Sequence, residues 1–527
     1  MINLIKKIFI LFIIPILIGI ASSFSLPPYD LIFINFFVYP TLYLFLVSIE
    51  KDKKLFSFIF GWMFGFGYFI SSLYWISNAL TFDDVFKPLI PLSIITIPLF
   101  LGIFYGLATF FASFIKIKKN FSSILIFCLI FAIIEFIRGY ILGGFPWNLI
   151  VYSLTKYLYS IQILSLVGTY SLNLLALTIF TLPASLIFKQ SIKSKLLIIF
   201  LLSTFILINN LYGIWNIDQF NKISKEKINY KIKIINPNIT IDRFFNTDDS
   251  EPLIREIIKL SKVNSNEKSV YVFPEGVFSH IYFSDLKYYK KLFSESFSNQ
   301  DLIVLGMNTQ KLENGKNKIY NSLIVTDNNL NLLSIYDKIK LVPFGEFLPF
   351  ENILSKIGLK KITQGYQSYS ANKNKREVID LNLNNFSFIP LICYEIIYSG
   401  KINNYNQKNN FIINISEDGW FGKSIGIEQH FSHAIFRSIE EGKNLIRASN
   451  NGITGYINPV GEIIKKLKST EKGMIVLDYF YKPINTVFGK FGNKIFVYFI
   501  IFYIIFIFFI KLIEKRIANE KRLFIYK

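Results

Sequence analysis

Residues 494–512 read KIFVYFIIFYIIFIFFIKL, an apolar run interrupted only by a lysine near each end. A helix needs about 20 mostly apolar residues to cross the hydrocarbon core of a bilayer, so this run predicts a membrane span. The composition agrees: 52% of the 527 residues are hydrophobic and 18% are charged. Soluble domains carry roughly 25% charged residues. At least part of this chain is therefore expected to lie in a membrane.

Further apolar runs of similar length precede residue 214, which brings the prediction to eight spans. The loops after the second, fourth, sixth and last of these runs are rich in lysine, and the loops between them are poor in it. Basic residues mark cytoplasmic loops. We therefore expect both termini in the cytoplasm and residues 214–493 on the periplasmic side. The earlier runs are 8–21, 31–48, 56–80, 88–115, 121–137, 158–187 and 196–213.

The same charge pattern explains much of the net charge of +21 as a signal of topology, which argues against nucleic acid as a partner. The first run, with its basic start, also fits a cleavable signal peptide. The six spans directly downstream favour a retained helix. The predicted division is 1–213 as a membrane domain with seven spans, 214–493 as a water-facing domain, and 494–527 as a last span with a cytoplasmic tail.

The polar region 214–493 alternates short apolar segments with helical ones, which predicts a layered α/β domain. Residues 251–263 and 427–443 are the clearest helix candidates. The strand candidates are rich in Ile, Val, Phe or Tyr, and several are apolar throughout, as in strands buried on both faces. They are residues 231–239, 269–276, 302–308, 321–327, 386–395, 411–418, 445–450 and 453–459.

Three residues in this region form a chemically useful set. Glu275 and Cys393 each end an apolar strand candidate, and Lys338 lies in a nearby loop. A cysteine thiolate is a nucleophile, a carboxylate can take its proton, and an ammonium can stabilise the oxyanion of an attacked carbonyl. Taken singly, each residue has a structural explanation: a packed thiol, a helix cap and a solvated lysine. The set together favours acyl transfer through a thioester.

Longer motifs surround these residues. The segment from Tyr336 to Glu346 contains Lys338, and Cys393-Tyr394-Glu395 contains the thiol. Both resemble motifs of the apolipoprotein N-acyltransferase family, whose members carry a carbon–nitrogen hydrolase, or nitrilase-like, domain. The resemblance covers nearly the whole chain and implies an αββα sandwich inserted into a polytopic α-helical membrane protein. Other similar motifs are Asp418–Gly422, Gln429-His430, Arg447–Thr454, Gly67–Phe69, Tyr74–Ile76, Glu135–Gly139 and Gly144–Trp147.

The resemblance implies a ping-pong acyl transfer in the bacterial inner membrane. Cys393 attacks the sn-1 ester of a phospholipid and keeps the acyl chain as a thioester. The α-amine of the diacylglyceryl-cysteine of an apolipoprotein then accepts the chain. No metal or organic cofactor is implied, and a monomer is expected. The implied roles are Glu275 as general base, Lys338 as oxyanion stabiliser, Tyr394 as a backbone N–H donor, Glu346 and Glu395 as supports, and Trp420 and Phe245 as substrate contacts.

The chain departs from the family pattern at several positions. Lys340 stands where the family usually has His, and Glu417 where it usually has Asn. Asn236 replaces a Gln, and Phe245 replaces an aromatic residue that is often Trp. These changes leave the proposed triad intact, but they weaken the assignment of lipid contacts in those loops.

Two other functions remain open at this stage. A membrane-anchored amidase would use the same triad with water as the acceptor, and a transporter or scaffold would carry an inactive domain. His430 and His433 could suggest a metal pair, but neither cysteine is near them in the sequence and no carboxylate has a recognised spacing to them. Glu135 and Arg138 lie near the predicted membrane interface and fit either a function, or mutual pairing and snorkelling. Cys128 is expected to pack inside a span, and Trp420-Phe421 to be either core or lid.

Overall fold

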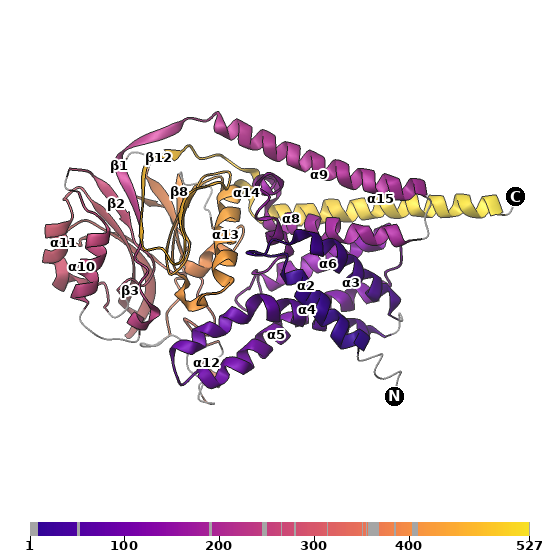
Figure 1. Cartoon of the computed structure of the whole chain (residues 1–527), viewed down its shortest axis with the longest axis horizontal. Coiled ribbons are helices and arrows are strands. Elements are labelled where there is room, and N and C mark those ends of the chain that lie inside the picture. Colours follow the sequence, from indigo (N-terminus) through magenta and orange to yellow (C-terminus); the bar gives the residue numbers. More distant parts are fainter. Residues whose placement is uncertain are drawn as a thin grey trace. The chain divides into compact units, whose positions relative to one another are not determined.

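The computed structural model divides into two compact units. The helical unit comprises Met1–Tyr74, Pro91–Asn216 and Phe491–Lys527, and the sheet unit comprises Trp75–Ile90 and Ile217–Lys490. Figure 1 colours the elements of both along the chain. The structure describes residues 9–49, 53–188, 192–244, 250–264, 266–278, 281–313, 315–349, 351–354, 356, 368–383, 386–402 and 409–525.

Among the described residues, six helices are long and apolar enough to cross a membrane. The prediction of membrane-spanning helices is therefore confirmed. The first two of the eight predicted spans appear as shorter apolar helices, Phe9–Ser23 and Ile32–Ser48, so the count of eight stays a prediction. The six are Lys54–Phe82, Lys87–Phe114, Phe121–Arg138, Leu164–Ile187, Lys195–Asn221 and Lys494–Ile517.

Close packing in the helical unit depends on small residues. A side chain at Gly19 would meet the carbonyl oxygen of Phe64 at 2.2 Å, and one at Gly67 would meet that of Ile16 at 2.2 Å. Without side chains, the backbones of α2 and α4 can touch. The α-helices of this unit are α2 (Ile14–Ser23), α3 (Asn35–Ser48), α4 (Lys54–Leu73), α5 (Ile90–Phe114), α6 (Phe121–Arg138), α7 (Leu158–Ile161), α8 (Leu164–Thr181), α9 (Ile192–Asn221) and α15 (Lys494–Ile525).

The predicted span 158–187 is interrupted. The chain forms the short helix α7, restarts as α8, and continues past residue 181 as a 3₁₀ helix, Leu182–Ile187. Gly168 has φ 73° inside α8, a conformation that a residue without a Cβ adopts readily. Hydrophobicity alone does not reveal such a break.

Two charged residues are buried in α6 with separate, neutral partners. Glu135 accepts hydrogen bonds from the Tyr105 hydroxyl at 2.8 Å and from the Asn173 amide at 2.6 Å. Arg138 Nη1 donates to the carbonyl oxygens of Phe145, at 2.6 Å, and Trp147. Both side chains are fully enclosed, so the snorkelling considered for Arg138 does not occur. Cys128, also on α6, is a buried free thiol, consistent with a packing role.

The sheet unit contains two six-stranded sheets. The first has the order β12-β1-β2-β3-β4-β5 and the second β11-β10-β9-β8-β7-β6. Each has a parallel centre, β1-β2-β3 and β7-β8-β9. The strands are β1 (Lys225–Asn236), β2 (Ser269–Val272), β3 (Leu302–Glu313), β4 (Lys316–Thr326), β5 (Leu332–Asp337), β6 (Ile379–Asp380), β7 (Ser387–Ile392), β8 (Phe411–Glu417), β9 (Asn444–Asn450), β10 (Thr454–Ile457), β11 (Ile463–Leu467) and β12 (Gly473–Tyr481).

The sheets pack face to face between helices. Strand β1 contacts β9 and β10, and β4 contacts β7. In Figure 1, α10 (Glu251–Leu260) and α11 (Lys290–Ser296) cover the first sheet, and α13 (Gly426–Glu441) covers the second. This is the expected αββα layering. Two further short helices are α12 (Glu351–Leu354) and α14 (Val487–Phe491).

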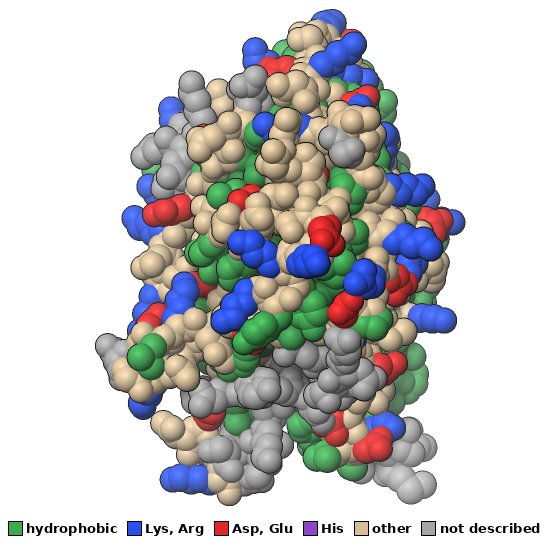
Figure 2. Space-filling model, turned by 90° about the vertical axis from the view of Figure 1, so that its left-hand side faces the viewer, with side chains coloured by type: hydrophobic (Ala, Val, Ile, Leu, Met, Phe, Trp, Pro, Cys, Tyr) green, Lys and Arg blue, Asp and Glu red, His purple; other side chains and the backbone are tan. Residues whose placement is uncertain are grey.

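The surface and the core of the sheet unit differ sharply. On the face drawn in Figure 2, basic and acidic side chains are interspersed, as on proteins that face water. Strands β7, β8 and β9 are buried almost throughout, because both faces of this sheet are covered.

Strands β5, β6, β11 and β12 were not predicted. The last two carry exposed lysines or polar residues that obscure their pattern.

Candidate active site

Cys393 lies at a sharp turn after a buried strand. β7 ends at Ile392, and a 3₁₀ turn, Cys393–Ile397, begins at once. The backbone of Cys393 has φ 46°, in the left-handed region that residues other than glycine rarely adopt. Glu395 holds this turn, because its Oε2 accepts a hydrogen bond from the Ile392 N–H at 2.9 Å. Such strained turns occur where a protein positions a reactive group.

Lys338 is enclosed between two carboxylates. Its Nζ lies 2.8 Å from Glu346 Oε1 and 3.3 Å from Glu275 Oε1, and the lysine side chain is 1% exposed. The three residues come from separate segments: the loop after β2, the residue after β5, and the loop at 346. The structure therefore brings together Glu275, Lys338 and Glu346.

Neutral donors fix the orientation of the carboxylates. Asn321, on β4, donates from Nδ2 to Glu275 Oε1 at 2.6 Å and to Glu346 Oε1 at 2.8 Å. The backbone N–H of Glu417 donates to Glu275 Oε2 at 3.0 Å. The N–H of Val342 donates to Glu346 Oε2 at 2.8 Å. Each carboxylate is thus held at both of its oxygens.

The charges of this cluster determine its protonation. Burial opposes the charge on Lys338, but Glu275 and Glu346 outweigh it and raise its pKa well above the usual value. Burial raises the pKa of Glu275, and the neighbouring Glu346 adds to this effect against the attraction of Lys338. Burial, and next the Glu275 carboxylate, raise the pKa of the Cys393 thiol well above its usual value. Burial therefore favours the protonated form of the Cys393 thiol and makes the Glu275 carboxylate a stronger base.

Glu395 joins the lysine segment to the cysteine turn. Besides Ile392, its carboxylate accepts hydrogen bonds from the backbone N–H groups of Ile339 and Lys340 at 3.0 and 3.2 Å. The Tyr336 hydroxyl donates at 2.7 Å, and Arg376 Nη2 donates at 2.9 Å. One buried carboxylate therefore connects segments from three parts of the chain.

Three aromatic residues have predicted roles: Tyr394 as a backbone donor, and Trp420 and Phe245 as substrate contacts. The Tyr394 ring packs edge-on against Tyr398 at 5.5 Å. Trp420 packs against Phe82 and Phe244, with ring centroids 5.7 and 5.2 Å away. Phe245 lies outside the described residues.

Two of the departures from the family pattern have structural partners. Glu417 forms a buried ion pair with Arg243, and it also accepts from Asn450 Nδ2 at 2.7 Å. Its additional charge is therefore neutralised. Asn236 donates from Nδ2 to the carbonyl oxygen of Glu471 at 2.9 Å, which joins the end of β1 to the loop before β12.

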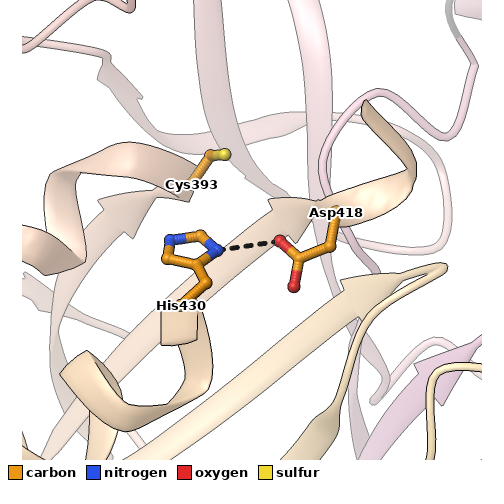
Figure 3. A group of neighbouring side chains, drawn as sticks. All are labelled: Cys393, Asp418 and His430. Carbon is orange, nitrogen blue, oxygen red and sulfur yellow. Dashed lines mark hydrogen bonds and ion pairs between the residues drawn. The ribbon is translucent and has the colours of Figure 1, made fainter. Parts of the chain in front are cut away.

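A second buried cluster lies beside the nucleophile candidate. Potential ligand atoms of Cys393, Asp418 and His430 lie within 4.8 Å of one another (Figure 3). His430 Nδ1 is 2.9 Å from Asp418 Oδ1, the contact dashed in the figure. Arg447 Nη2 lies 2.7 Å from Asp418 Oδ2 and 2.9 Å from His430 Nδ1. The guanidinium already occupies the position of a cation, so these residues do not fit a metal ion.

The electrostatics of this second cluster follow from the arginine. Burial opposes the charge of Asp418, but Arg447 and His430 outweigh it and hold its pKa well below the usual range. Burial, followed by Arg447, lowers the pKa of His430. A neutral imidazole is therefore expected beside an ionised carboxylate. His433 is also buried on α13, and burial lowers its pKa well below the usual value.

Sequence reasoning missed Asn321, Arg243 and the partnership of Arg447 with Asp418. Asn321 lies opposite Asn308 in the antiparallel pair β3-β4, a register that only the fold shows. The distances along the sequence from Arg243 to Glu417 and from Asp418 to Arg447 do not match any known motif. Only the fold shows that these residues pair.

Comparison with known proteins matches both halves of the chain to families. The family model for the apolipoprotein N-acyltransferase N-terminal domain matches residues 18–182, and the carbon–nitrogen hydrolase model matches residues 247–479. The chain is 31% identical to an apolipoprotein N-acyltransferase of Rhodopseudomonas palustris over 88% of each chain. It is 30% identical to one of Brucella melitensis over 90% of each. Nit3 of Saccharomyces cerevisiae, a nitrilase-superfamily member, matches with 16% identity and TM-score 0.34, over 50% of this chain and 92% of that one.

Proposed function

The chain belongs to the apolipoprotein N-acyltransferase family, and from this we propose that it transfers an sn-1 acyl chain from a membrane phospholipid to the N-terminal diacylglyceryl-cysteine of apolipoproteins. The observation that carries the chemistry is Lys338, buried between two carboxylates, together with the strained turn at Cys393. The proposed partners are the bilayer, the lipid donor and the diacylated acceptor.

In the first half-reaction, Glu275 takes the proton of the Cys393 thiol, and the thiolate attacks the ester carbonyl. Burial supports this role for Glu275, because a raised pKa makes a carboxylate a better base. Lys338 and the backbone N–H of Tyr394 stabilise the oxyanion. The carbon–oxygen bond then breaks, the lysophospholipid leaves with the proton from Glu275, and the acyl chain remains as a thioester.

In the second half-reaction, the α-amine of the apolipoprotein attacks the thioester. Glu275 accepts a proton from the amine, the carbon–sulfur bond breaks, and the proton returns to the Cys393 sulfur. An amide forms, and the enzyme is restored, which gives ping-pong kinetics. None of these steps calls for a metal or an organic cofactor.

The supporting residues act through position. Glu346 holds Lys338 directly, and Glu395 holds the lysine segment against the cysteine turn. Trp420 and Phe245 are proposed to contact the lipid chains.

The placement in the membrane is also part of the proposal. The lysine-rich loops support a multi-pass protein of the bacterial inner membrane with eight spans, cytoplasmic termini and residues 214–493 in the periplasm. A monomer is expected. A reporter that is active only in the periplasm, fused after residue 213, should show activity. Activity of a reporter that works only in the cytoplasm would contradict this orientation.

The main test follows a labelled acyl chain. Purified protein is incubated with phospholipid radiolabelled on the sn-1 chain, and then with a diacylated lipopeptide. We expect hydroxylamine-sensitive label on the protein and its transfer to the peptide. Cys393→Ala should lose both, and Cys128→Ala, the matched control, should retain both. Label on the Cys393→Ala protein would exclude this mechanism, and release of label only as free fatty acid would favour the amidase-like hydrolase.

A further inference from the structure

A cavity of about 310 Å³ lies beside the segments that carry Lys338 and Cys393. Its wall includes Lys340, which follows Lys338 by two residues, and Glu395, which follows Cys393 by two. The volume falls at the lower end of the range for small-molecule sites, about 300–1,000 Å³. The cavity can therefore hold a ligand the size of a small headgroup.

The wall of this cavity is strongly basic. Its described lining residues include Lys340, Lys375 and Lys401, together with Arg376 and Glu395, which form an ion pair at 2.9 Å. That carboxylate already accepts hydrogen bonds from backbone and side-chain donors at both of its oxygens. The structure thus concentrates positive charge around a hollow, and the acid in its wall is engaged in holding the loops.

The lysines of the wall are crowded. The ammonium groups of Lys340 and Lys401 lie 6.0 and 5.2 Å from the centre of the same Tyr398 ring. Burial and the neighbouring Lys340 lower the pKa of Lys401 to about 8. Like charges brought together at a partly buried position create a potential that favours an anion. Lys340 is also a departure from the family pattern, so the additional charge belongs to this chain.

We propose that this basic cavity binds a phosphate group. Phosphate offers several oxygens to the lysine donors of the wall, and its charge offsets their mutual repulsion. Two sources share this chemistry: the headgroup of an anionic phospholipid, and free inorganic phosphate. The lipid source rests on the proposed function, because the headgroup would then belong to the acyl donor or to the lysophospholipid product.

Binding can be measured without acyl transfer. The full-length protein in detergent is titrated by calorimetry at constant ionic strength with inorganic phosphate, and separately with glycerophosphoglycerol, the soluble headgroup of phosphatidylglycerol. We expect saturable binding of at least one probe. Lys340→Gln and Lys401→Gln should each weaken it by roughly tenfold, as one charge-assisted hydrogen bond is lost. Absence of saturable binding for both probes would overturn the proposal.

Matched variants separate a built site from general charge attraction. Lys291→Gln removes the same charge from an exposed position of the sheet unit, where the lysine side chain is 87% exposed. It should leave the affinity unchanged, and an equal loss in this variant would overturn the proposal. Lys340→Arg and Lys401→Arg keep the charge and should bind within about threefold of the parent. An unchanged Tm of the glutamine variants excludes misfolding as the cause of their loss.

The two sources give different results. Tighter binding of glycerophosphoglycerol than of phosphate supports a lipid headgroup, and binding of phosphate alone supports a free anion. For the lipid source, Lys340→Gln should raise the KM of thioester formation for phosphatidylglycerol more than for phosphatidylethanolamine, with kcat preserved. If no lipid gives a thioester, the proposed function fails while phosphate binding still stands.

Discussion

The two units of this protein bury charge in opposite ways. In the helical unit, Glu135 accepts from a hydroxyl and an amide, and Arg138 Nη1 donates to two backbone carbonyls. In the sheet unit, Lys338 is placed between two carboxylates. In the first arrangement, each charged group is hydrogen-bonded to neutral polar groups. In the second, two carboxylates share one ammonium group. Only the second can readily exchange a proton, and this difference separates a structural polar cluster from a reactive one.

The largest effect is expected when the shared cation is removed. Lys338→Met keeps the length of the side chain but leaves Glu275 and Glu346 buried together without a counter-charge. Thioester formation should fall by about 10³-fold, and the free energy of unfolding by about 3–5 kcal/mol. Single-turnover labelling and chemical denaturation in detergent measure these losses. A variant with near-normal labelling would show that Lys338 is not needed at the oxyanion.

The next test uses pH. Because the pKa of Glu275 is raised, its basic form is lost at a pH above the usual carboxylate value of 4.5 as the solution is acidified. The rate of thioester formation should therefore fall on the acidic side within that higher range. Glu346→Gln removes one cause of the raised pKa, so the acidic limb of the rate profile should move to lower pH. An acidic limb that stays at the same pH in Glu346→Gln would show that Glu346 does not influence the pKa of the catalytic base.

A smaller effect is expected in the helical unit. Glu135→Gln places an amide NH₂ against the Asn173 amide, whose oxygen already accepts from the Val151 N–H at 3.1 Å. The variant should lose about 1–3 kcal/mol of stability, seen as a lower Tm, with its labelling rate near that of the parent protein. A loss of labelling as large as that of Lys338→Met would erase the distinction between the two clusters.

The smallest effect is expected at the other thiol. Cys128 is fully buried on α6, and Cys128→Ala removes a single sulfur atom from a packed interior. We expect a cost of about 1 kcal/mol and unchanged acyl labelling. Mass spectrometry of the labelled protein should find the acyl group on Cys393 alone, and any acylation of Cys128 would revise the division of roles between the two cysteines.

Much of this arrangement could be predicted from the sequence. Continuous apolar runs gave the membrane-type helices, and short Ile- and Val-rich segments gave the central strands of both sheets. Residues that follow such strands, such as Cys393 and Glu275, were expected to converge. The structure places Glu275 beside Lys338 and Glu346.

Other features depend on tertiary contacts that no local pattern contains. The segment Trp75–Ile90 looks like the end of a span, yet it belongs to the sheet unit, where Asn78 donates to the carbonyl oxygen of Phe421 at 2.6 Å. Asn321 reaches both carboxylates because β4 passes next to them, and a single asparagine in a strand does not indicate which face it occupies. The edge strands were missed because their exposed residues lack a strict alternation.

The buried pair of Arg243 and Glu417 has an evolutionary consequence. The acid replaces a residue that is usually neutral in the family pattern, and the arginine neutralises it inside the protein. Restoring the common residue by Glu417→Asn would leave Arg243 enclosed without a counter-ion, so a change toward the family consensus would be harmful in this chain. We therefore expect the cost of Glu417→Asn to depend on the residue at position 243, which is epistasis. Replacing Arg243 by a neutral residue at the same time should lower that cost.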